Sequence, residues 1–330
     1  MRFRQQNGVP LKNTHAAGRD YRYNSIMTDN LKTRCPACQS VDLDDFGEIL
    51  HALPAMVAGV PINLGEQQYQ LCKCNKCQLR FKSPAVEERR LTACYEASNS
   101  SHWNDRPDPH RRRFDEMLSL VRKFAPGTDI IDIGCFNGAM LEYFGVEFDR
   151  FGIEPSRDAA AVARERGVNV LGASLYDIPP VARFDAVLAI DVLEHIAEPV
   201  VFFEKVTSVL RPGGVFISLT GDADSMSWKL QGARHWYCSL PEHVTFFDRK
   251  SIGELGRRAG LDEVWYKRVS HQRNGLWHWM NDLSKNLAFT CAYRLGGERL
   301  PGIGRKLRRR APVWLSATDH MLHVGRKQSR

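Results

Sequence analysis

The residues with the clearest chemical potential lie in one glycine-containing stretch, which reads TDIIDIGCFNGAMLEYF from Thr128 to Phe144. A short apolar run ends in a turn at Gly134, and a helix-compatible segment begins after Gly138. Glycine lets the backbone turn tightly and lets a ligand approach the new helix, whose first N–H groups are unpaired and attract polar or anionic groups. With the acid Asp132 at the strand end, the pattern predicts a strand–loop–helix unit that binds a cofactor.

The spacing of these glycines disfavours one class of cofactor, the dinucleotides. A dinucleotide fold needs G-x-G-x-x-G, but Phe136 stands where the central glycine belongs, so a pyrophosphate would lack its backbone cradle. Glu154, 22 positions after Asp132, follows a second predicted strand. A nucleoside-binding fold places a carboxylate there to accept hydrogen bonds from both ribose hydroxyls. A packing loop with the same letters is the structural alternative for the glycine stretch alone.

Two cysteine pairs predict a metal site near the N-terminus. Cys35 and Cys38 form one CxxC pair, and Cys74 and Cys77 form the other. Such pairs place thiolates at the spacing that a tetrahedral zinc ion requires, and four sulfur ligands make a closed, structural site. Cys72 is a fifth candidate, so either Cys72 or Cys74 is the spare. The alternatives are two unrelated thiol pairs or a redox CxxC, which the absence of a βαβ setting disfavours.

The elements that must position these residues alternate between strands and helices from residue 128 onward. This alternation predicts an α/β fold with a parallel sheet and helices on both faces. The expected boundaries are a disordered segment over 1–30, a zinc ribbon over 31–83 and a helical connector over 84–125. The cofactor domain is expected over 126–330, with a helical insertion over 271–318.

Four features in this order resemble class I S-adenosylmethionine-dependent methyltransferases. They are the glycine loop with its acid, Glu154, the sequence FDAVLAIDVLEHI over 184–196 and the sequence LRPGGVFISL over 210–219. The resemblance implies a doubly wound, seven-stranded, Rossmann-like methyltransferase sheet. It also implies that the last strand, expected over 319–326, inserts antiparallel between the fifth and sixth strands.

The same resemblance assigns residues to an S-adenosylmethionine site. Those implied to contact the cofactor are Asp132, Gly134, Cys135 and Gly138 at the methionine end, Glu154 at the ribose, and Asp191 near the sulfonium. The family often places an acid early in the loop after the third strand, but this chain has Ala173 and Ser174 there. Adenine recognition is therefore expected from groups at Ser174 and Leu175, with Asp177 as a weaker candidate. Phe136, in place of the central glycine, is expected to narrow the pocket.

Methyl transfer to a hydroxyl also requires a general base, and histidine suits this role because its pKa lies near neutrality. His195 follows the fourth predicted strand, while His235 and His243 lie after the fifth. The hypothesis makes His243 the base, with Glu242 or Tyr237 assisting, and keeps His195 as another candidate. Each histidine also has a structural interpretation, as a helix cap or as a buried ring with its hydrogen bonds satisfied.

Composition indicates the structural class of the protein and its cellular compartment. The chain has 330 residues, of which 43% are hydrophobic and 25% charged, which is typical of a globular protein with room for two domains. No apolar run reaches the roughly 18 residues that a membrane span needs, and the N-terminal stretch does not resemble a secretory signal. Nine cysteines that include two CxxC pairs favour reduced thiols and a metal, so a cytoplasmic protein is expected.

The net charge of +8 and the insertion raise the question of partners. The basic run Arg305 to Arg310 is interpreted as a solvated face in preference to a surface for anionic partners. The insertion, which includes Trp277, Trp279 and Trp314, is interpreted as a helical lid. Its alternative is a peripheral membrane contact through residues 274–312.

A zinc ribbon ahead of such a domain resembles two groups of methyltransferases. The pattern CPxC…CxxCxLxF, from Cys35 to Phe81, is similar to sugar methyltransferases of deoxysugar and surface-polysaccharide pathways. The other group, zinc-bearing RNA base methyltransferases, is disfavoured because no Asn/Asp-Pro-Pro-Tyr motif begins at Asp191. The predicted activity is methylation of a small-molecule or carbohydrate acceptor at a sugar hydroxyl. The alternatives are an RNA methyltransferase and a non-catalytic cofactor-binding protein.

Overall fold

The computed structural model describes residues 34–51, 54–98, 111–270, 276–296 and 318–329. All of them belong to the second of two units into which the chain divides, Leu31–Arg330. The first unit, Met1–Asn30, includes the segment expected to be disordered and lies outside the described residues.

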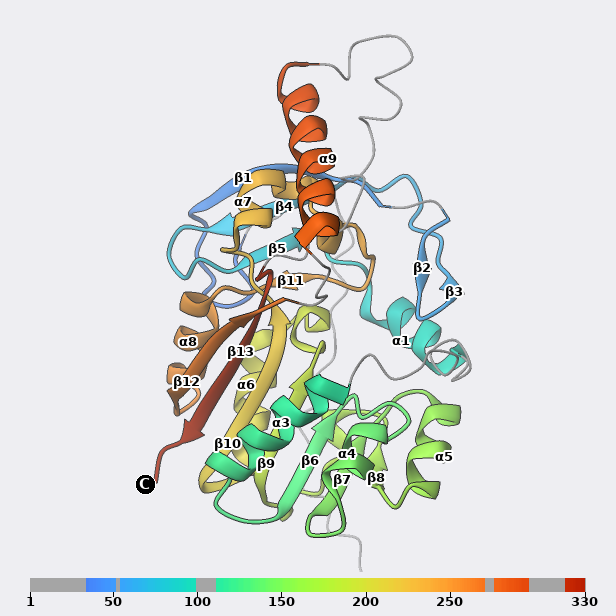
Figure 1. The fold of residues 1–330 in the computed structure, drawn as a ribbon, viewed down its shortest axis with the longest axis vertical. Coiled ribbons are helices and arrows are strands. Elements are labelled where there is room, and N and C mark those ends of the chain that lie inside the picture. The colour runs from blue at the N-terminus through green and yellow to red at the C-terminus, as the bar shows by residue number, and fades with distance from the viewer. Residues whose placement is uncertain (1–33, 52–53, 99–110, 271–275, 297–317, 330) are drawn as a thin grey trace, which may run out of the picture. The chain divides into compact units, whose positions relative to one another are not determined.

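A seven-stranded sheet forms the centre of this unit, with the strand order β12-β13-β10-β9-β6-β7-β8 (Figure 1). Its strands are β6 (Asp129–Ile133), β7 (Asp149–Ile153), β8 (Asn169–Gly172), β9 (Phe184–Ile190), β10 (Leu210–Gly221), β12 (Leu261–Val269) and β13 (His320–Lys327). Strands β10, β9, β6, β7 and β8 are parallel neighbours, while β13 runs antiparallel to both β10 and β12. The predicted doubly wound fold and the antiparallel insertion of the last strand are therefore confirmed.

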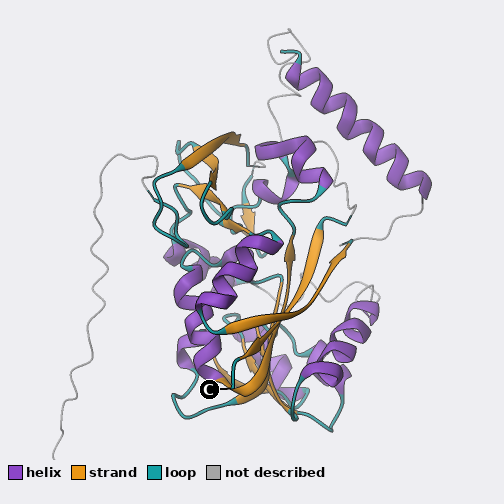
Figure 2. Cartoon of the chain, turned by 90° about the vertical axis from the view of Figure 1, so that its left-hand side faces the viewer, coloured by secondary structure: helices purple, strands orange, loops and turns teal. Residues whose placement is uncertain are grey.

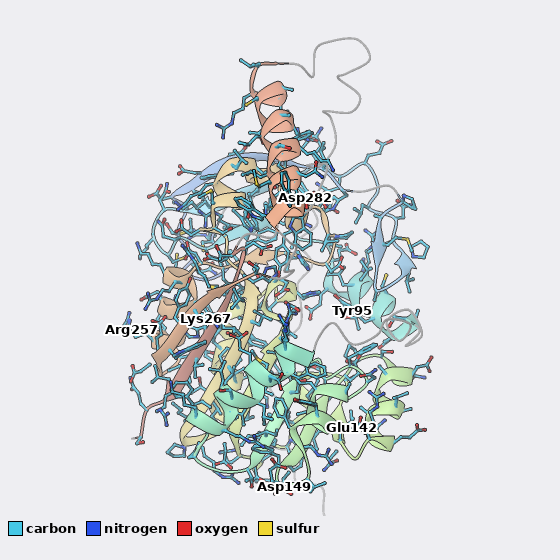
Figure 3. All side chains as sticks on the ribbon, viewed as in Figure 1. Tyr95, Glu142, Asp149, Arg257, Lys267 and Asp282 are labelled. Carbon is cyan, nitrogen blue, oxygen red and sulfur yellow. The ribbon has the colours of Figure 1, made fainter. Side chains whose placement is uncertain are left out.

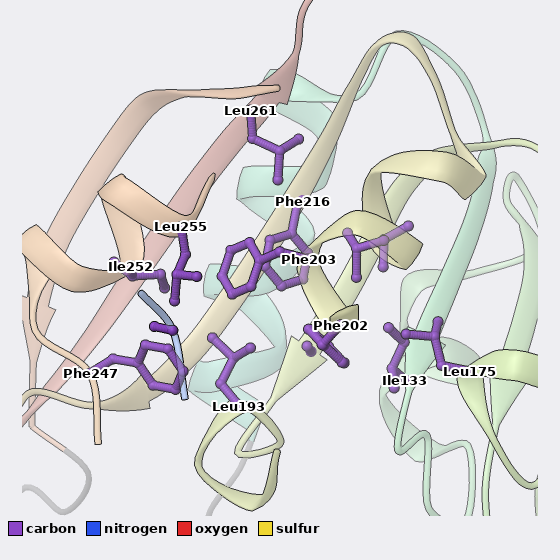
Figure 4. Close-up of a cluster of buried hydrophobic side chains, with 14 of the residues drawn as sticks. Ile133, Leu175, Leu193, Phe202, Phe203, Phe216, Phe247, Ile252, Leu255 and Leu261 are labelled. Atoms are coloured by element: carbon purple, nitrogen blue, oxygen red, sulfur yellow. The ribbon is translucent and has the colours of Figure 1, made fainter. Parts of the chain in front are cut away.

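Helices cover both faces of this sheet (Figure 2). They are α3 (Arg111–Phe124), α4 (Ala139–Phe144), α5 (Arg157–Glu165), α6 (Pro199–Val209) and α8 (Arg249–Arg258). Successive residues of a strand point to opposite faces. In β6, Ile131 and Ile133 accordingly pack with α6 and α8, whereas Ile130 packs with α3, α4 and α5. Figure 4 shows the first of these cores, where Phe203 of α6 meets Phe216 of β10.

Strand β10 begins at Leu210, so Arg211 to Gly214 lie within the strand although Pro-Gly-Gly normally ends an element. A register shift between Leu210 and Val215 in the pairing with β9 accommodates the intervening Pro-Gly-Gly within the strand. By contrast, the helix predicted after Gly138 is present as α4, which begins at Ala139.

The N-terminal cysteines lie on a second, four-stranded sheet with the order β1-β4-β5-β11. Its strands are β1 (Leu43–Ile49), β4 (Tyr69–Cys74), β5 (Arg80–Ser83) and β11 (Thr245–Phe246), beside the small hairpin β2 (Met56–Val57) and β3 (Val60–Pro61). The pairing of β11 with β5 is antiparallel and places Thr245 opposite Phe81. The ribbon is therefore hydrogen-bonded to the segment that carries His243.

The remaining elements lie in the segments between these strands and helices. They are α1 (Glu88–Ala97), α7 (Met226–Gln231), α9 (Leu276–Arg294) and the short 3-10 helices η1 (Leu175–Asp177), η2 (Leu193–His195), η3 (Gly232–Arg234) and η4 (Trp236–Ser239). Helix α9 contacts α7 through Asn286, which accepts a hydrogen bond from Gln231. Among the described residues, no helix is long and apolar enough to cross a membrane.

Candidate active site

The glycine loop connects β6 to α4 in the conformation that its sequence predicts. Gly134 and Gly138 have φ angles of 75° and 74°, which side chains rarely adopt. A Cβ on Gly138 would lie 3.0 Å from the backbone of Ala163, so only glycine lets the two segments approach this closely. Phe136, at the position of the family's central glycine, also has a positive φ of 47°. The loop therefore keeps the turn despite the bulkier residue.

Two buried carboxylates face this loop and fit a polar cofactor. Glu154 accepts hydrogen bonds from the backbone N–H of Phe136 at 2.9 Å and of Ser156 at 2.7 Å, and each of its oxygens retains a second lone pair. Asp132 is 4% exposed, and its Oδ1 has no hydrogen-bond partner among the described residues. Burial raises the pKa of both groups. A buried acceptor without a donor is costly, so a ligand that donates to Asp132 would stabilise the site.

The loop after β8 is more self-contained than expected. Asp177 accepts hydrogen bonds from the backbone N–H groups of Ala173 and Ser174, both at 2.9 Å, so its carboxylate shapes the turn. The hydroxyl of Ser174 accepts from Tyr176 N, and Leu175 packs into the core. Contact of Ser174 and Leu175 with adenine stays a prediction.

The carboxyl ends of β9 and β10 bring together the residues proposed for proton transfer. Asp191 directly follows β9 with a φ of 54° and forms an ion pair with Arg113 of α3 at 3.1 Å. This sharp turn leads into η2, which carries Glu194 and His195. One ligand atom from each of Glu194, His195 and His243 lies within 4.8 Å of the others. These three residues are called the acid–histidine cluster below.

Glu194 is fixed by two hydroxyl groups. Tyr237 donates to its Oε1 at 2.5 Å, and Thr220 donates to its Oε2 at 2.8 Å. Glu194 is 1% exposed, and burial, followed by the charge of Asp191, raises its pKa to about 7. At neutral pH the carboxyl group is therefore close to half protonated, and the position of its proton depends on its neighbours.

The two histidines are held by hydrogen bonds at Nδ1. His243 Nδ1 lies 3.0 Å from the carbonyl oxygen of Tyr237 and must donate to it, which leaves a lone pair on Nε2. His195 Nδ1 lies 2.5 Å from the hydroxyl of Tyr95, which Figure 3 places on α1. The two rings are 5.0 Å apart. The Nε2 atoms of His195 and His243, together with the Glu194 carboxylate, also form a set of ligands suited to a transition-metal ion.

Burial keeps both rings neutral. It lowers the pKa of His195 to about 4 and lowers that of His243 well below the ordinary value, with the neighbouring His195 as the second cause. A neutral imidazole can accept a proton at physiological pH, although a depressed pKa makes it a weaker base.

Two other sequence candidates lie outside this cluster. His235 is stacked on Trp228 at 4.7 Å, and its Nε2 and Nδ1 lie beside Ser227 and the N–H of Tyr237. It is 1% exposed, which fits a structural role. Burial raises the pKa of Glu242, and its Oε2 has no hydrogen-bond partner within the described part of the chain. No hydrogen bond joins Glu242 to His243 in that part.

Sequence reasoning missed Lys82, which reaches this region from the ribbon. Lys82 is 2% exposed, and its Nζ donates to the carbonyl oxygens of Leu240 at 2.8 Å and Pro241 at 3.3 Å. Burial lowers its pKa to about 7. It therefore fixes the backbone directly before Glu242 and His243. Nothing in the sequence near Phe81 indicated that a lysine would be buried.

In the ribbon, the structure brings together Cys35, Cys38, Cys74 and Cys77. One sulfur from each lies within 4.8 Å of the others, with 3.5 Å between Cys35 and Cys77 and 3.4 Å between Cys38 and Cys74. Cys72 is not a member of this group and packs in the core. Of the two candidates for the fourth ligand, the geometry favours Cys74.

Comparison with known proteins identifies the type of domain. Residues 109–265 match a family model described as a methyltransferase domain. A ubiquinone biosynthesis O-methyltransferase of Nitrobacter winogradskyi is 25% identical over 166 residues, 43% of this chain and 62% of the relative. One of Cereibacter sphaeroides is 28% identical over 190 residues, 52% of this chain and 76% of the relative.

Among solved structures, the N-methyltransferase NodS of Bradyrhizobium japonicum, in complex with S-adenosyl-L-homocysteine, has a TM-score of 0.45 and 14% identity. The likeness covers 72% of this chain and 96% of NodS. From the sheet, the glycine loop and the family match, the chain contains an S-adenosylmethionine-dependent methyltransferase domain with the class I, Rossmann-like fold.

Replacing Glu154 with alanine should weaken cofactor binding while the fold is kept. The side chain connects the glycine loop to the turn after β7, and its oxygens provide the only pair of acceptors we assign to the ribose. We expect the affinity for S-adenosylhomocysteine, measured by calorimetric titration, to fall at least tenfold, the scale of a lost hydrogen bond to a charged group. Glu142→Ala, an exposed change on α4, is the control and should bind as the wild type does. Equal affinities of the two variants would remove Glu154 from the ribose role.

The raised pKa of Glu194 predicts a pH-dependent stability. Because the folded state holds this proton up to about pH 7, whereas the unfolded state releases it near 4.5, its contribution to stability is complete below pH 4.5 and is lost as the pH rises through 7. Thermal unfolding of Glu194→Gln, which cannot ionise, should lack this part of the pH dependence. Its melting temperature should therefore rise relative to the wild type between pH 5 and 8. Parallel profiles of the two proteins over this range would contradict the assignment.

Proposed function

We propose that this protein transfers a methyl group from S-adenosylmethionine to a hydroxyl group of a small-molecule acceptor. The observation that carries the proposal is the acid–histidine cluster at the same edge of the sheet as the glycine loop. Ligands of open α/β sheets bind at the carboxyl ends of the strands, where both features lie. The names of the relatives, O-methyltransferases of ubiquinone biosynthesis, support a hydroxyl acceptor.

The bound cofactor would supply an activated methyl group on a sulfonium. Glu154 would hold its ribose, and Asp132 would accept from a donor at its methionine end. His243 Nε2 would take the proton of the acceptor hydroxyl, since its Nδ1 is held by Tyr237 O. Glu194, hydrogen-bonded to Tyr237, would stabilise the imidazolium that forms.

For the acceptor, we propose a carbohydrate. The support is the ribbon spacing from Cys35 to Phe81, which resembles sugar methyltransferases, together with the hydrogen bonds that join this ribbon to the segment of His243. Sugar hydroxyls ionise only at high pH, so their methylation needs a positioned base, which the cluster offers.

We also propose that the four clustered cysteines bind one structural zinc ion. Four thiolates around a common centre are the ligands of closed zinc sites, and the buried position of three of them excludes water. Metal analysis should give one zinc per chain. Two metal ions per chain would mean that the acid–histidine cluster also binds one, and removal of the second by a chelator would then lower turnover.

A single set of measurements tests the function. Calorimetric titration with S-adenosylhomocysteine should show micromolar binding, and screening with radiolabelled S-adenosylmethionine should show transfer to nucleotide sugars or glycans. Transfer to phenolic quinone precursors in preference to sugars would keep the class and overturn the carbohydrate proposal. Transfer to RNA, with a strong dependence on salt, would support the alternative disfavoured by the sequence. Failure to bind the cofactor would indicate a non-catalytic protein.

The two interpretations of the insertion, a helical lid and a peripheral membrane contact, stay predictions. Helix α9 exposes Trp277 (83%), Met280 (49%) and Leu287 (42%), whereas residues 297–317, with the basic run and Trp314, lie outside the described residues. Flotation with vesicles of anionic lipid distinguishes these two interpretations. Binding of the intact protein that is lost without residues 274–312 would support membrane contact, and no binding would support the lid.

A further inference from the structure

A cavity of about 300 Å³ lies between the ribbon and the segment that follows β10. Its walls come from β1, β4 and β5 on the ribbon side, and from α7, η3 and the end of α9 on the other. Cavities of this size are at the lower end of those that hold small molecules. None of the residues that we assign to the cofactor or to the acid–histidine cluster lines it.

The lining is strongly cationic. It contains Arg80, Lys229, Arg234 and Arg294, against one acid, Glu48. Two of these cations are neutralised, since Arg80 pairs with Asp248 and Lys229 with Asp224. Within the described part of the chain, Arg234 and Arg294 have no carboxylate partner. The cavity therefore carries positive charge that a ligand could neutralise.

Three buried polar atoms on lining residues have unused hydrogen-bonding capacity. Arg234 Nη1, Trp228 Nε1 and Gln231 Oε1 have no hydrogen-bond partner among the described residues. Arg234 is 9% exposed, and its guanidinium is stacked 4.9 Å from the centre of the Tyr293 ring. Leaving such donors unpaired is costly, whereas a guanidinium in a fixed position binds phosphate oxygens in pairs.

The cavity adjoins the proposed active site through one side chain. Trp228 lines the cavity, and its ring also packs on His235 at 4.7 Å and against Tyr237 at 6.4 Å. Tyr237 in turn donates to Glu194 of the acid–histidine cluster. Tyr237 also packs against His243 at 4.0 Å, so two aromatic rings, Trp228 and Tyr237, separate the cavity from the proposed base.

We propose that this cavity binds the diphosphate of a nucleotide-activated carbohydrate. Arg234 and Arg294 bind the phosphate oxygens, Trp228 Nε1 adds a neutral donor, and the rings of Tyr293 and Phe46 provide apolar surface for the nucleoside. This inference rests on the proposed methyltransferase function and specifies its acceptor. It explains why the ribbon, which supplies Phe46 and Arg80, is joined to the catalytic domain by a shared sheet.

Calorimetric titration tests this directly, without any methyl transfer. Inorganic pyrophosphate and uridine diphosphate are titrated into the full chain saturated with S-adenosylhomocysteine, so that the cofactor site is blocked. We expect both to bind, with uridine diphosphate tighter than pyrophosphate because of the aromatic lining. Arg234→Gln should weaken binding of both at least about tenfold, the scale of a lost charge-assisted pair. Arg294→Gln should weaken binding of both probes several-fold. Because Arg294 is exposed on α9, this substitution leaves the buried packing intact, which Arg234→Gln does not.

The control is Arg89→Gln, which removes an exposed arginine of α1 and should bind both probes as the wild type does. Equal binding by Arg234→Gln, Arg294→Gln and the control would mean that phosphate binds elsewhere, for example at Arg305 to Arg310, and would overturn the proposal. No binding of either probe, with S-adenosylhomocysteine bound normally, would also overturn it while leaving the methyltransferase proposal intact. Failure to bind S-adenosylhomocysteine would instead count against the proposed function.

Discussion

Replacing His243 with asparagine should lower turnover at least ~100-fold, in line with the contribution of a general base, and should leave the affinity for S-adenosylhomocysteine unchanged. An asparagine amide can still donate to the carbonyl oxygen of Tyr237, as His243 Nδ1 does, so the backbone is supported while the proton acceptor is lost. The residues assigned to the ribose and to the methionine end of the cofactor lie on β6, in the loop after it and after β7, outside the segment that carries His243. Single-turnover rates and calorimetric titration of the same preparation measure the two quantities.

A matched control separates chemistry from packing. His235→Asn removes a ring that is as buried as His243 and belongs to the same loop, but that packs on Trp228 outside the cluster. We expect a similar fall in melting temperature and less than a tenfold fall in turnover. If His243→Asn loses no more activity than His235→Asn, then His243 is a structural residue. His195, whose side chain is 24% exposed, would then become the first candidate for the base.

The second large effect concerns the ribbon. Cys74→Ser should abolish the proposed zinc site and lower the melting temperature steeply, because structural zinc contributes on the order of 10 kcal/mol of apparent binding free energy in small zinc domains. The control is Cys72→Ser. Cys72 lies on the same strand as Cys74 but outside the group of four clustered sulfur atoms, so this variant should retain the metal. Metal analysis and thermal unfolding of both variants check this. Retention of zinc by Cys74→Ser and its loss by Cys72→Ser would exchange the two assignments.

Unfolding of the ribbon should also disturb the proposed active site. Lys82 holds the carbonyl oxygens of Leu240 and Pro241, and β5 pairs with β11 on the other side of His243. We therefore expect metal-depleted protein to keep cofactor binding and to lose methyl transfer. Parallel loss of both would indicate that the whole unit unfolds.

The parts of the fold that follow from local pattern could be predicted from the sequence. The glycine loop between β6 and α4 was predictable because two glycines with positive φ and an apolar strand are encoded within a few residues. The order of the sheet followed from the family resemblance, including the antiparallel β13. The pattern for β10 was misleading, since Pro-Gly-Gly normally ends a strand and here lies within a register shift.

The parts that depend on distant contacts could not be predicted. The pairing of β5 with β11 joins segments that have no common sequence signal, because backbone hydrogen bonds do not depend on side-chain identity. The contacts of Tyr95 with His195 and of Lys82 with the backbone before His243 join side chains to residues far away in the sequence, and no local pattern reports them. The histidines themselves were found because their side chains have chemistry that few other residues provide.

The sheet that connects the ribbon to the catalytic domain also affects how the chain is made. Strand β5 ends at Ser83, but its partner β11 begins only at Thr245, so most of the methyltransferase domain must be synthesised in between. At cellular elongation rates this takes on the order of ten seconds, during which one edge of the nascent ribbon is unpaired. An open strand edge invites pairing with other chains. The nascent ribbon therefore avoids aggregation only if encounters with other chains are slow or if a chaperone covers its open edge. Fragments of the chain that stop before Thr245 should be prone to aggregation.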